Sequence, residues 1–512
     1  MGEVKFDAVV VGAGFSGLYL VKRLADAGFS VLGVEAAPGV GGTWYWNAYP
    51  GARCDVQSFD YCYSFSKELA EEWTWSERYP SQPEILRYLD HVADRFGLKR
   101  HYRFSTRVES AAFDEQSGKW TLGLDGGAHL ICRHFILAGG AISAPKPPEY
   151  SGIEDYQGEW YLTAQWPHRP ISFQGKRVAV IGTGSSGIQT TTAIVDEVAQ
   201  LTVFQRTPNF CAPLINRSLT EPEQAEYRAT RDERYETARW SRSGVPDAQP
   251  TRAMAEVDEA ERAKILENAW VNSHIFALRL TFTDVMTNPE TNDRIAEFVR
   301  GKIREAVHEP ELAERLTPRG YPFAAKRPCI GADYFEMYNR DKVRLVDLRE
   351  TPIVRFTTDG IETTGGEMPF DMVIFATGFD GITGAAARID ITGRGAVKLR
   401  DKWADGPQTY LGLMSHGFPN LFLVTGPLSV GPLSAMLRTI EQHVDFIADC
   451  LIEMRRKGHV LIEPRRQDEL AWIDHAREVA EGTLYPHADS WYMGANVPGK
   501  PRVFMAYLGG VG

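Results

Sequence analysis

The sequence contains few cysteines for its length, and none of them belongs to a recognisable metal or redox motif. Six cysteines occur in 512 residues, and no two are spaced as C-x-x-C, which argues against a redox-active disulfide and against the usual zinc spacing. The histidines show no metal-ligand spacing either, so we expect no metal site. So few thiols fit a reducing compartment, and we expect a cytoplasmic location.

Long apolar runs and an excess of positive charge are also missing. No apolar stretch approaches the roughly 20 residues of a transmembrane helix, so we expect no membrane span. Lys and Arg number 56 against 67 Asp and Glu, a net charge of −11. That charge would repel nucleic acid and anionic lipid, and we expect neither as a partner. Apolar residues make up 43% of the chain, which is typical of a globular protein, and the length indicates about three domains.

A dinucleotide-binding pattern begins near the N-terminus. A short β-branched strand is expected over residues 6–11, followed by a G-x-G-x-x-G turn, a helix over 18–27 and a second strand over 30–34. Glu35 ends that strand, where a carboxylate accepts hydrogen bonds from a ribose diol. The glycines allow a pyrophosphate to approach the start of the helix, although a glycine-rich turn can be purely structural. They are Gly12, Gly14 and Gly17.

The pattern recurs in the middle of the chain. A strand over 176–181, a second G-x-G-x-x-G turn, a helix over 188–195 and a strand over 201–204 follow in the same order. A carboxylate is missing where the first unit has Glu35, and Arg206 stands nearby. A guanidinium suits a 2′-phosphate, so we expect NADP(H) in this unit, the alternative being a surface arginine after a strand. The glycines of this turn are Gly182, Gly184 and Gly187.

Two further segments indicate FAD in the first unit. Gly41-Gly-Thr-Trp44 follows the first unit, and Ala376-Thr-Gly378 closes an apolar strand over 372–375. Both features are typical of flavoproteins that bind two nucleotides.

The order of these segments predicts the fold class. We expect an α/β protein with two Rossmann-like dinucleotide-binding domains, for FAD and NADP, and a mainly helical insertion in the second. A Pro-rich crossover over 141–150 joins the two units. The predicted parts are an FAD domain of residues 1–140 and 385–512, an NADP domain of residues 150–214 and 321–384, and an insertion of residues 215–320.

Several long stretches resemble one known family over essentially the whole chain. These stretches are Gly41 to Asp55, Lys326-Arg327, Tyr334 to Asp341 and Trp491 to Pro501. The chain resembles the type I Baeyer–Villiger monooxygenases, flavin enzymes that insert an oxygen atom beside a carbonyl.

The fingerprint of that family, F-x-G-x-x-x-H-x-x-x-W-[PD], is present with two changes. Gly158, Trp166 and Pro167 match, whereas Tyr156 replaces the phenylalanine and Leu162 replaces the histidine. In the family this histidine links domain motion to cofactor binding and does not perform the oxygen transfer. The resemblance therefore implies that the chemistry is retained and that coupling to NADPH differs.

The resemblance implies that NADPH reduces FAD, that O2 adds at the flavin C4a position, and that the resulting peroxide anion converts a ketone into an ester or lactone. It implies that Arg327 holds the peroxide anion and that Asp55 positions this arginine. The other residues that it implies bind FAD (Gly42, Thr43, Trp44 and Asp55), bind NADP (Arg206, Thr207, Lys326 and Trp491) or line the substrate pocket (Gly431, Pro432 and Leu433).

Two other functions stay open at this point. A flavin monooxygenase that oxidises sulfur or nitrogen shares the same two nucleotide units, although a sulfide needs a protonated peroxide rather than an anion held by arginine. Leu162 also leaves open an uncoupled NADPH oxidase or a cofactor-binding regulator. The sequence leaves the oligomeric state undetermined.

Overall fold

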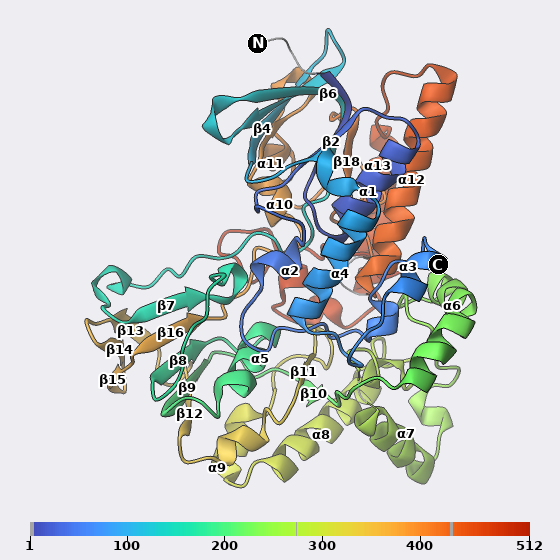
Figure 1. The fold of residues 1–512 in the computed structure, drawn as a ribbon. Helices are drawn as coiled ribbons and strands as arrows, with labels where there is room; N and C mark the ends of the chain where they lie inside the picture. Colours follow the sequence, from blue (N-terminus) through green and yellow to red (C-terminus); the bar gives the residue numbers. More distant parts are fainter. Residues whose placement is uncertain (1–4, 273, 431–433, 512) are drawn as a thin grey trace.

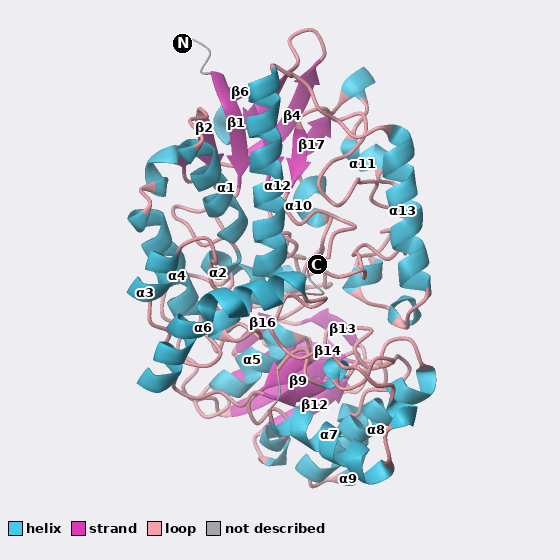
Figure 2. Cartoon of the chain, turned by 90° about the vertical axis from the view of Figure 1, so that its right-hand side faces the viewer, coloured by secondary structure: helices cyan, strands magenta, loops and turns pink. Residues whose placement is uncertain are grey.

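Two sheets, each built around a strand–glycine turn–helix unit, form the frame of the molecule (Figure 1). The computed structural model describes residues 5–272, 274–430 and 434–511. In Figure 2 the first sheet lies at the top and the second near the bottom, with helix α12 (Met436–Lys457) running down the middle of the upper part, in front of the first sheet. The predicted fold class, α/β with two Rossmann-like units, is confirmed.

The first sheet has the strand order β17-β4-β5-β6-β1-β2-β3, and β18 pairs with β6. Strands β6, β1, β2 and β3 run parallel, whereas β4, β5 and β6 form an antiparallel meander. The strands are β1 (Lys5–Val11), β2 (Val31–Val34), β3 (Tyr102–Arg103), β4 (Val108–Asp114), β5 (Lys119–Leu124), β6 (His129–Leu137), β17 (Asp390–Thr392) and β18 (Leu421–Leu423).

The second sheet is parallel throughout, in the order β12-β9-β8-β16-β7. Its strands are β7 (Glu159–Leu162), β8 (Arg177–Ile181), β9 (Gln200–Gln205), β12 (Val343–Asp347) and β16 (Met372–Phe375). A parallel pair, β10 (Cys211–Pro213) with β11 (Cys329–Gly331), and an antiparallel meander, β13 (Ile353–Phe356), β14 (Gly360–Thr363) and β15 (Gly366–Pro369), flank it.

The two helices after the glycine turns begin three residues earlier than predicted. Helix α1 spans Phe15–Asp26 and α5 spans Ser185–Ile194, so Gly17 and Gly187 lie inside the first turn of their helices. A Cβ on Gly17 would come within 1.9 Å of the Gly12 carbonyl oxygen. The third glycine therefore allows the helix to pack directly on the turn.

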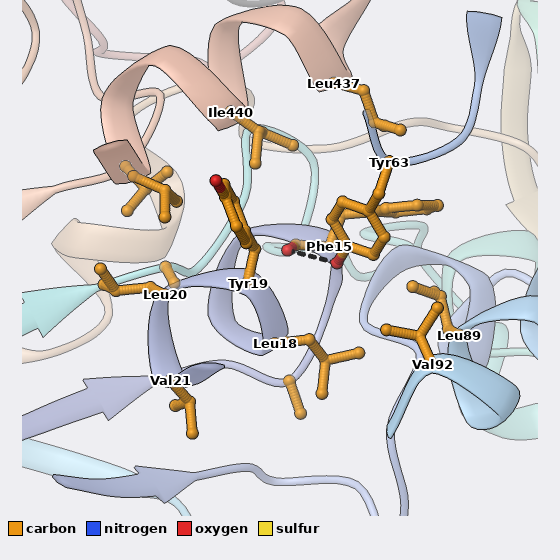
Figure 3. Packing of buried hydrophobic residues seen from close by; sticks show 14 of the residues in the cluster. Phe15, Leu18, Tyr19, Leu20, Val21, Tyr63, Leu89, Val92, Leu437 and Ile440 are labelled. Carbon is orange, nitrogen blue, oxygen red and sulfur yellow. Dashed lines mark hydrogen bonds between the residues drawn. The ribbon is translucent and has the colours of Figure 1, made fainter. Parts of the chain in front are cut away.

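Helices from both ends of the chain cover the first sheet. Figure 3 shows Leu18 and Tyr19 of α1 facing Leu89 of α4 (Gln82–Arg95) and Ile440 of α12, and the Tyr63 hydroxyl donates to the Phe15 carbonyl oxygen at 2.7 Å. The other helices of these parts are α2 (Thr43–Trp46), α3 (Lys67–Glu72), α10 (Gly384–Ala387), α11 (Leu399–Lys402) and α13 (Arg466–Glu481). The segment after residue 385 thus returns to the first sheet, through β17, β18 and α12.

The helical segment between residues 215 and 320 packs against both cores. Tyr227 and Tyr235 of α6 (Glu221–Trp240) belong to the hydrophobic cluster of the first unit. Leu266 of α7 (Glu259–Val271) and Val299 of α8 (Pro289–Ala306) belong to the cluster of the second. The last helix of the segment, α9 (Pro310–Leu316), packs with α8. The segment is helical, as predicted, but it bridges the two units, and the domain boundaries stay a prediction.

No helix in the described ranges is both long enough and apolar enough to cross a membrane. All six cysteines are free thiols, and five of them are buried.

Candidate active site between the two nucleotide units

The first glycine turn is shaped by close contact with the neighbouring strand. Gly12 has a φ of +114°, and a Cβ there would lie 2.5 Å from the Ala138 carbonyl oxygen. Any other residue would be strained and would also clash, so only glycine fits. The backbone of the turn is thereby kept bare at the start of α1, the end that attracts a pyrophosphate.

Glu35 is held above this turn with its carboxylate already oriented. One carboxylate oxygen accepts from the Ala13 backbone N–H at 2.7 Å and the other from the Ala37 N–H at 2.8 Å. Glu35 is buried, and burial raises its pKa in spite of these bonds. Each oxygen can accept a further hydrogen bond, which fits the two hydroxyls of a ribose.

The segment that begins α2 closes the first turn. The Gly41 N–H donates to the Ala13 carbonyl oxygen at 2.9 Å, and a Cβ on Gly42 would lie 2.8 Å from the Gly14 Cα. Two backbones are therefore in direct contact, and Thr43 follows as the first residue of α2. Trp44 packs inward, and its indole N–H donates to the Tyr61 hydroxyl at 3.0 Å. These residues fit FAD in the first unit.

The second turn repeats the first but leaves open space. Gly182 has a φ of +117°, and a Cβ would lie 2.4 Å from the Ala376 carbonyl oxygen, whereas a Cβ on Gly184 would meet nothing within 4 Å. Nearby, Thr377 Oγ1 and Asn496 Oδ1 are buried and have no hydrogen-bond partner. A bare backbone and unpartnered polar atoms fit a second dinucleotide here.

Positive charge gathers beside this second turn. Arg206 is exposed at the end of β9, and burial together with the charge of Arg206 lowers the pKa of Lys326. Lys146 of the crossover is also close enough to feel this charge, since burial and the charge of Arg206 lower the pKa of Lys146 as well. The side chain of Gln205, at the carboxylate position of the first unit, donates to the Arg315 carbonyl oxygen. The Thr207 carbonyl oxygen accepts from the Thr183 hydroxyl at 3.0 Å.

Arg327 and Asp55 meet although 272 positions separate them in the chain. Arg327 Nε donates to Asp55 Oδ2 at 3.0 Å, and Nη2 donates to both carboxylate oxygens at 2.8 Å. Their side chains are only 23% and 17% exposed. Such a fork–fork contact fixes the plane of the guanidinium. Burial lowers the pKa of Arg327, but Asp55 and Tyr492 together outweigh burial and raise it, so Arg327 stays charged.

Tyr492 completes this cluster and was missed by the sequence analysis. Its fully buried phenol is hydrogen-bonded to Arg327. The neighbouring Trp491 packs on the loop after Ala376-Thr-Gly378, since a Cβ on Gly381 would lie 2.7 Å from its indole ring. Tyr492 stands inside a motif that the sequence analysis quoted, so its place beside the tryptophan was the available signal. The predicted pocket residues Gly431, Pro432 and Leu433 lie outside the described residues.

Leu162 is buried in an apolar cluster at the edge of the second sheet. It ends β7 opposite Phe375 of β16 and is 8% exposed. Next to it, the Thr163 hydroxyl donates to the Phe375 carbonyl oxygen at 3.3 Å. The leucine at the fingerprint position therefore serves the packing of this sheet. Within the described part of the chain, no group of three or more His, Cys, Asp and Glu side chains could hold a metal ion.

Comparisons with known proteins agree with this geometry. The profile of the flavin-binding monooxygenase-like family matches residues 5–221. A Baeyer–Villiger monooxygenase of Pseudooceanicola batsensis is 41% identical over 99% of this chain and 93% of its own. A phenazine N-monooxygenase of Lysobacter antibioticus is 39% identical over 99% of this chain and 94% of its own.

A solved structure extends the agreement to the fold. The complex of OTEMO with FAD and NADP is 38% identical, superposes with a TM-score of 0.95, and is matched over 99% of this chain and 95% of that one. Both nucleotides thus occur in a protein with this fold. The chain belongs to the Baeyer–Villiger monooxygenases, flavoenzymes that use FAD and NADPH.

Proposed function

We propose that the protein oxidises a ketone to an ester or lactone at the Arg327–Asp55 pair, with O2 and NADPH as co-substrates. The single observation that carries this proposal is a largely buried guanidinium whose plane is fixed by Asp55. FAD, reduced by NADPH, supplies the electrons that activate O2. The side chains of the protein bind the two nucleotides and stabilise the charge that the reaction develops.

Binding of the two nucleotides is divided between the two glycine turns. Gly12, Gly14 and Gly17, with Glu35, are proposed to hold FAD, and Gly42 to Trp44 to cover it. Gly182, Gly184 and Gly187 are proposed to hold the pyrophosphate of NADP. Burial and, after it, the charge of Arg206 lower the pKa of Lys326, and a 2′-phosphate between the two cations would relieve their repulsion. Thr207 and Trp491 are proposed to flank this nucleotide.

Arg327 is proposed to stabilise the anionic oxygen that attacks the carbonyl carbon. As the new carbon–oxygen bond forms, the negative charge passes to the carbonyl oxygen, and a fixed cation stabilises the charge that develops there without reorganisation. Asp55 is proposed to position the guanidinium through the two oxygens that it presents to Nε and Nη2. Tyr492 is hydrogen-bonded to the same guanidinium.

The test is product analysis on the purified holoenzyme. A panel of linear and cyclic ketones is incubated with NADPH and 18O2. Mass spectrometry identifies the esters and lactones and shows whether the 18O label is the oxygen inserted beside the carbonyl. NADPH consumption and hydrogen peroxide are measured in the same samples. Labelled ester supports the proposal. If NADPH consumption yields only hydrogen peroxide, and no ketone gives an ester, the protein is instead an uncoupled oxidase.

Nitrogen oxidation is the second candidate, and the phenazine N-monooxygenase of comparable similarity favours it. Oxygen transfer to a nitrogen or sulfur atom does not pass through an anion on a carbonyl oxygen, so it does not need the anion-stabilising charge of Arg327. A phenazine and a thioether are therefore added to the panel for both the native protein and Arg327→Ala. If the variant still forms the N-oxide or sulfoxide but no ester, both activities belong to one site, and only ester formation requires the Arg327 charge.

A further inference from the structure

Helix α5 contacts the segments that carry both members of the Arg327–Asp55 pair. Its second turn contacts the segment that ends at Asp55, and its first turn contacts strand β11, which begins two residues after Arg327. The helix begins directly after Gly184, on which a Cβ would meet nothing within 4 Å. One helix therefore lies between the proposed pyrophosphate site and both halves of the pair.

Gln189 makes the contact with the Asp55 segment through both ends of its side-chain amide. Its Oε1 accepts from the Tyr49 hydroxyl at 2.9 Å and from the Arg53 backbone N–H at 3.4 Å. Its Nε2 donates to the Arg53 carbonyl oxygen at 3.1 Å. Burial and, after it, the charge of Asp55 raise the pKa of Tyr49, so this phenol stays protonated and can donate. A side chain that is only 6% exposed thus makes three hydrogen bonds to one short segment of the other unit.

The backbone of this segment lies directly on the helix. Gly51 has a φ of +77°, and a Cβ there would lie 2.4 Å from the Gln189 carbonyl oxygen, so the approach requires glycine. Further along the segment, the Cys54 N–H donates to the Pro80 carbonyl oxygen at 3.0 Å. The segment is therefore held between α5 and the first nucleotide unit.

The Arg327 side of the pair packs on the same helix. The Ser185 hydroxyl donates to Cys329 Sγ at 3.5 Å, and a Cβ on Gly331 would lie 2.6 Å from Ile188 Cγ2. Strand β11 therefore lies directly against the first turn of α5. Both segments that form the pair take their position from one helix.

We propose that Gln189 is a positioning residue, which holds Asp55 in place opposite Arg327 and thereby fixes the plane of the guanidinium. Its effect on catalysis rests on the proposed ketone oxidation. A displacement of about 1 Å at a reacting group can cost roughly 100-fold in rate. Loss of the Gln189 amide should therefore affect ester formation, while the glycine turns that are proposed to bind the nucleotides stay unchanged.

The first experiment measures how firmly the Asp55 segment is held. Gln189→Met keeps the length of the side chain and removes all three hydrogen bonds. Thr192→Val is the matched control, because Thr192 lies on the same helix and its hydroxyl donates to the Ile188 carbonyl oxygen of that helix. Hydrogen exchange of the FAD-loaded proteins is followed by mass spectrometry in peptides that cover residues 49–55.

Exchange in residues 49–55 should be roughly tenfold faster in Gln189→Met, since hydrogen bonds that hold the segment are lost. Thr192→Val should exchange like the native protein. Native exchange of residues 49–55 in both variants would overturn the proposal. Faster exchange throughout the chain of Gln189→Met would indicate a general loss of stability and would overturn it as well.

The second experiment measures how consumed NADPH is divided between ester and hydrogen peroxide. In Gln189→Met, KM for NADPH should stay within about threefold of the native value, and ester formed per NADPH should fall roughly 10- to 100-fold. Tyr49→Phe, which removes one of the three hydrogen bonds, should show a smaller fall. A residue that only supports the fold would lower NADPH consumption and ester formation in proportion, and that result would refute the proposal.

The two experiments separate this inference from the proposed function. If no ketone gives an ester, the proposed function is wrong, whereas faster exchange confined to residues 49–55 in Gln189→Met still supports Gln189 as the residue that holds Asp55. If the native protein and Gln189→Met form ester with the same yield per NADPH, the proposed function stands and this inference is overturned.

Discussion

Removal of the Arg327 guanidinium is the perturbation whose size the structure constrains best. The group is fixed by three N–H contacts of 2.8 to 3.0 Å to Asp55 and is 23% exposed. A unit charge about 4 Å from a developing anion, at an effective dielectric near 20, contributes about 4 kcal/mol. If that contribution is realised only in the attack step, Arg327→Ala lowers the rate of ester formation roughly a thousandfold.

The assay must separate loss of chemistry from loss of structure. Arg327→Ala leaves the Asp55 carboxylate without its cation in a largely buried place, which costs stability by itself. The double variant Arg327→Ala with Asp55→Asn removes both charges and is the structural control. FAD content is read from the absorption spectrum, thermal midpoints from unfolding curves, and ester and peroxide from the product mixture.

The expected result is an FAD-loaded protein that consumes NADPH and releases peroxide but gives almost no ester. Arg327→Lys should recover only part of the ester yield, because an ammonium keeps the charge without the planar fork that Asp55 holds. Ester at the native rate in FAD-loaded Arg327→Ala would remove this residue from the mechanism.

Three further outcomes are expected. Arg206→Ala should raise KM for NADPH at least tenfold more than KM for NADH, and an unchanged ratio between the two coenzymes would refute its role at the 2′-phosphate. Leu162→His should raise the ester formed per NADPH but lower the thermal midpoint, because the imidazole enters an apolar cluster; unchanged coupling would make the leucine neutral. Lys402→Met, which leaves the 2%-exposed carboxylate of Glu469 without its cation, should cost about 3–5 kcal/mol of unfolding free energy, and Lys402→Met with Glu469→Gln should regain most of it.

The nucleotide units could be predicted from the sequence because their information is local. A β-branched run, a glycine turn and an apolar helix follow one another directly in the chain, so recognising one of them helps to predict the next. The strand predicted over 372–375 has those same bounds in the structure. The helix starts were placed three residues late because the third glycine was taken as part of the turn, whereas it lies within the helix and permits its contact with Gly12.

The pair of Asp55 and Arg327 was reached only through a family resemblance, and the reason is physical. Nothing in the spacing of two residues 272 positions apart predicts a contact of 2.8 Å. The insertion shows the same limit. Its helical periodicity was visible, but which core each helix joins depends on the complementary surface, so α6 joins the first core and α8 the second.

Helix α5 gives the chain a way to couple its two units that does not pass through residue 162. Gln189 of α5 accepts from the Tyr49 hydroxyl at 2.9 Å and donates to the Arg53 carbonyl oxygen at 3.1 Å, which ties the NADP-side helix to the segment that ends at Asp55. Relative motion of the units must therefore act on the loop that carries Asp55, and through Asp55 on Arg327. Coupling of the two units therefore does not require a hydrogen-bonding side chain at position 162. The contacts of Gln189 already connect helix α5 to Asp55, which orients the Arg327 guanidinium.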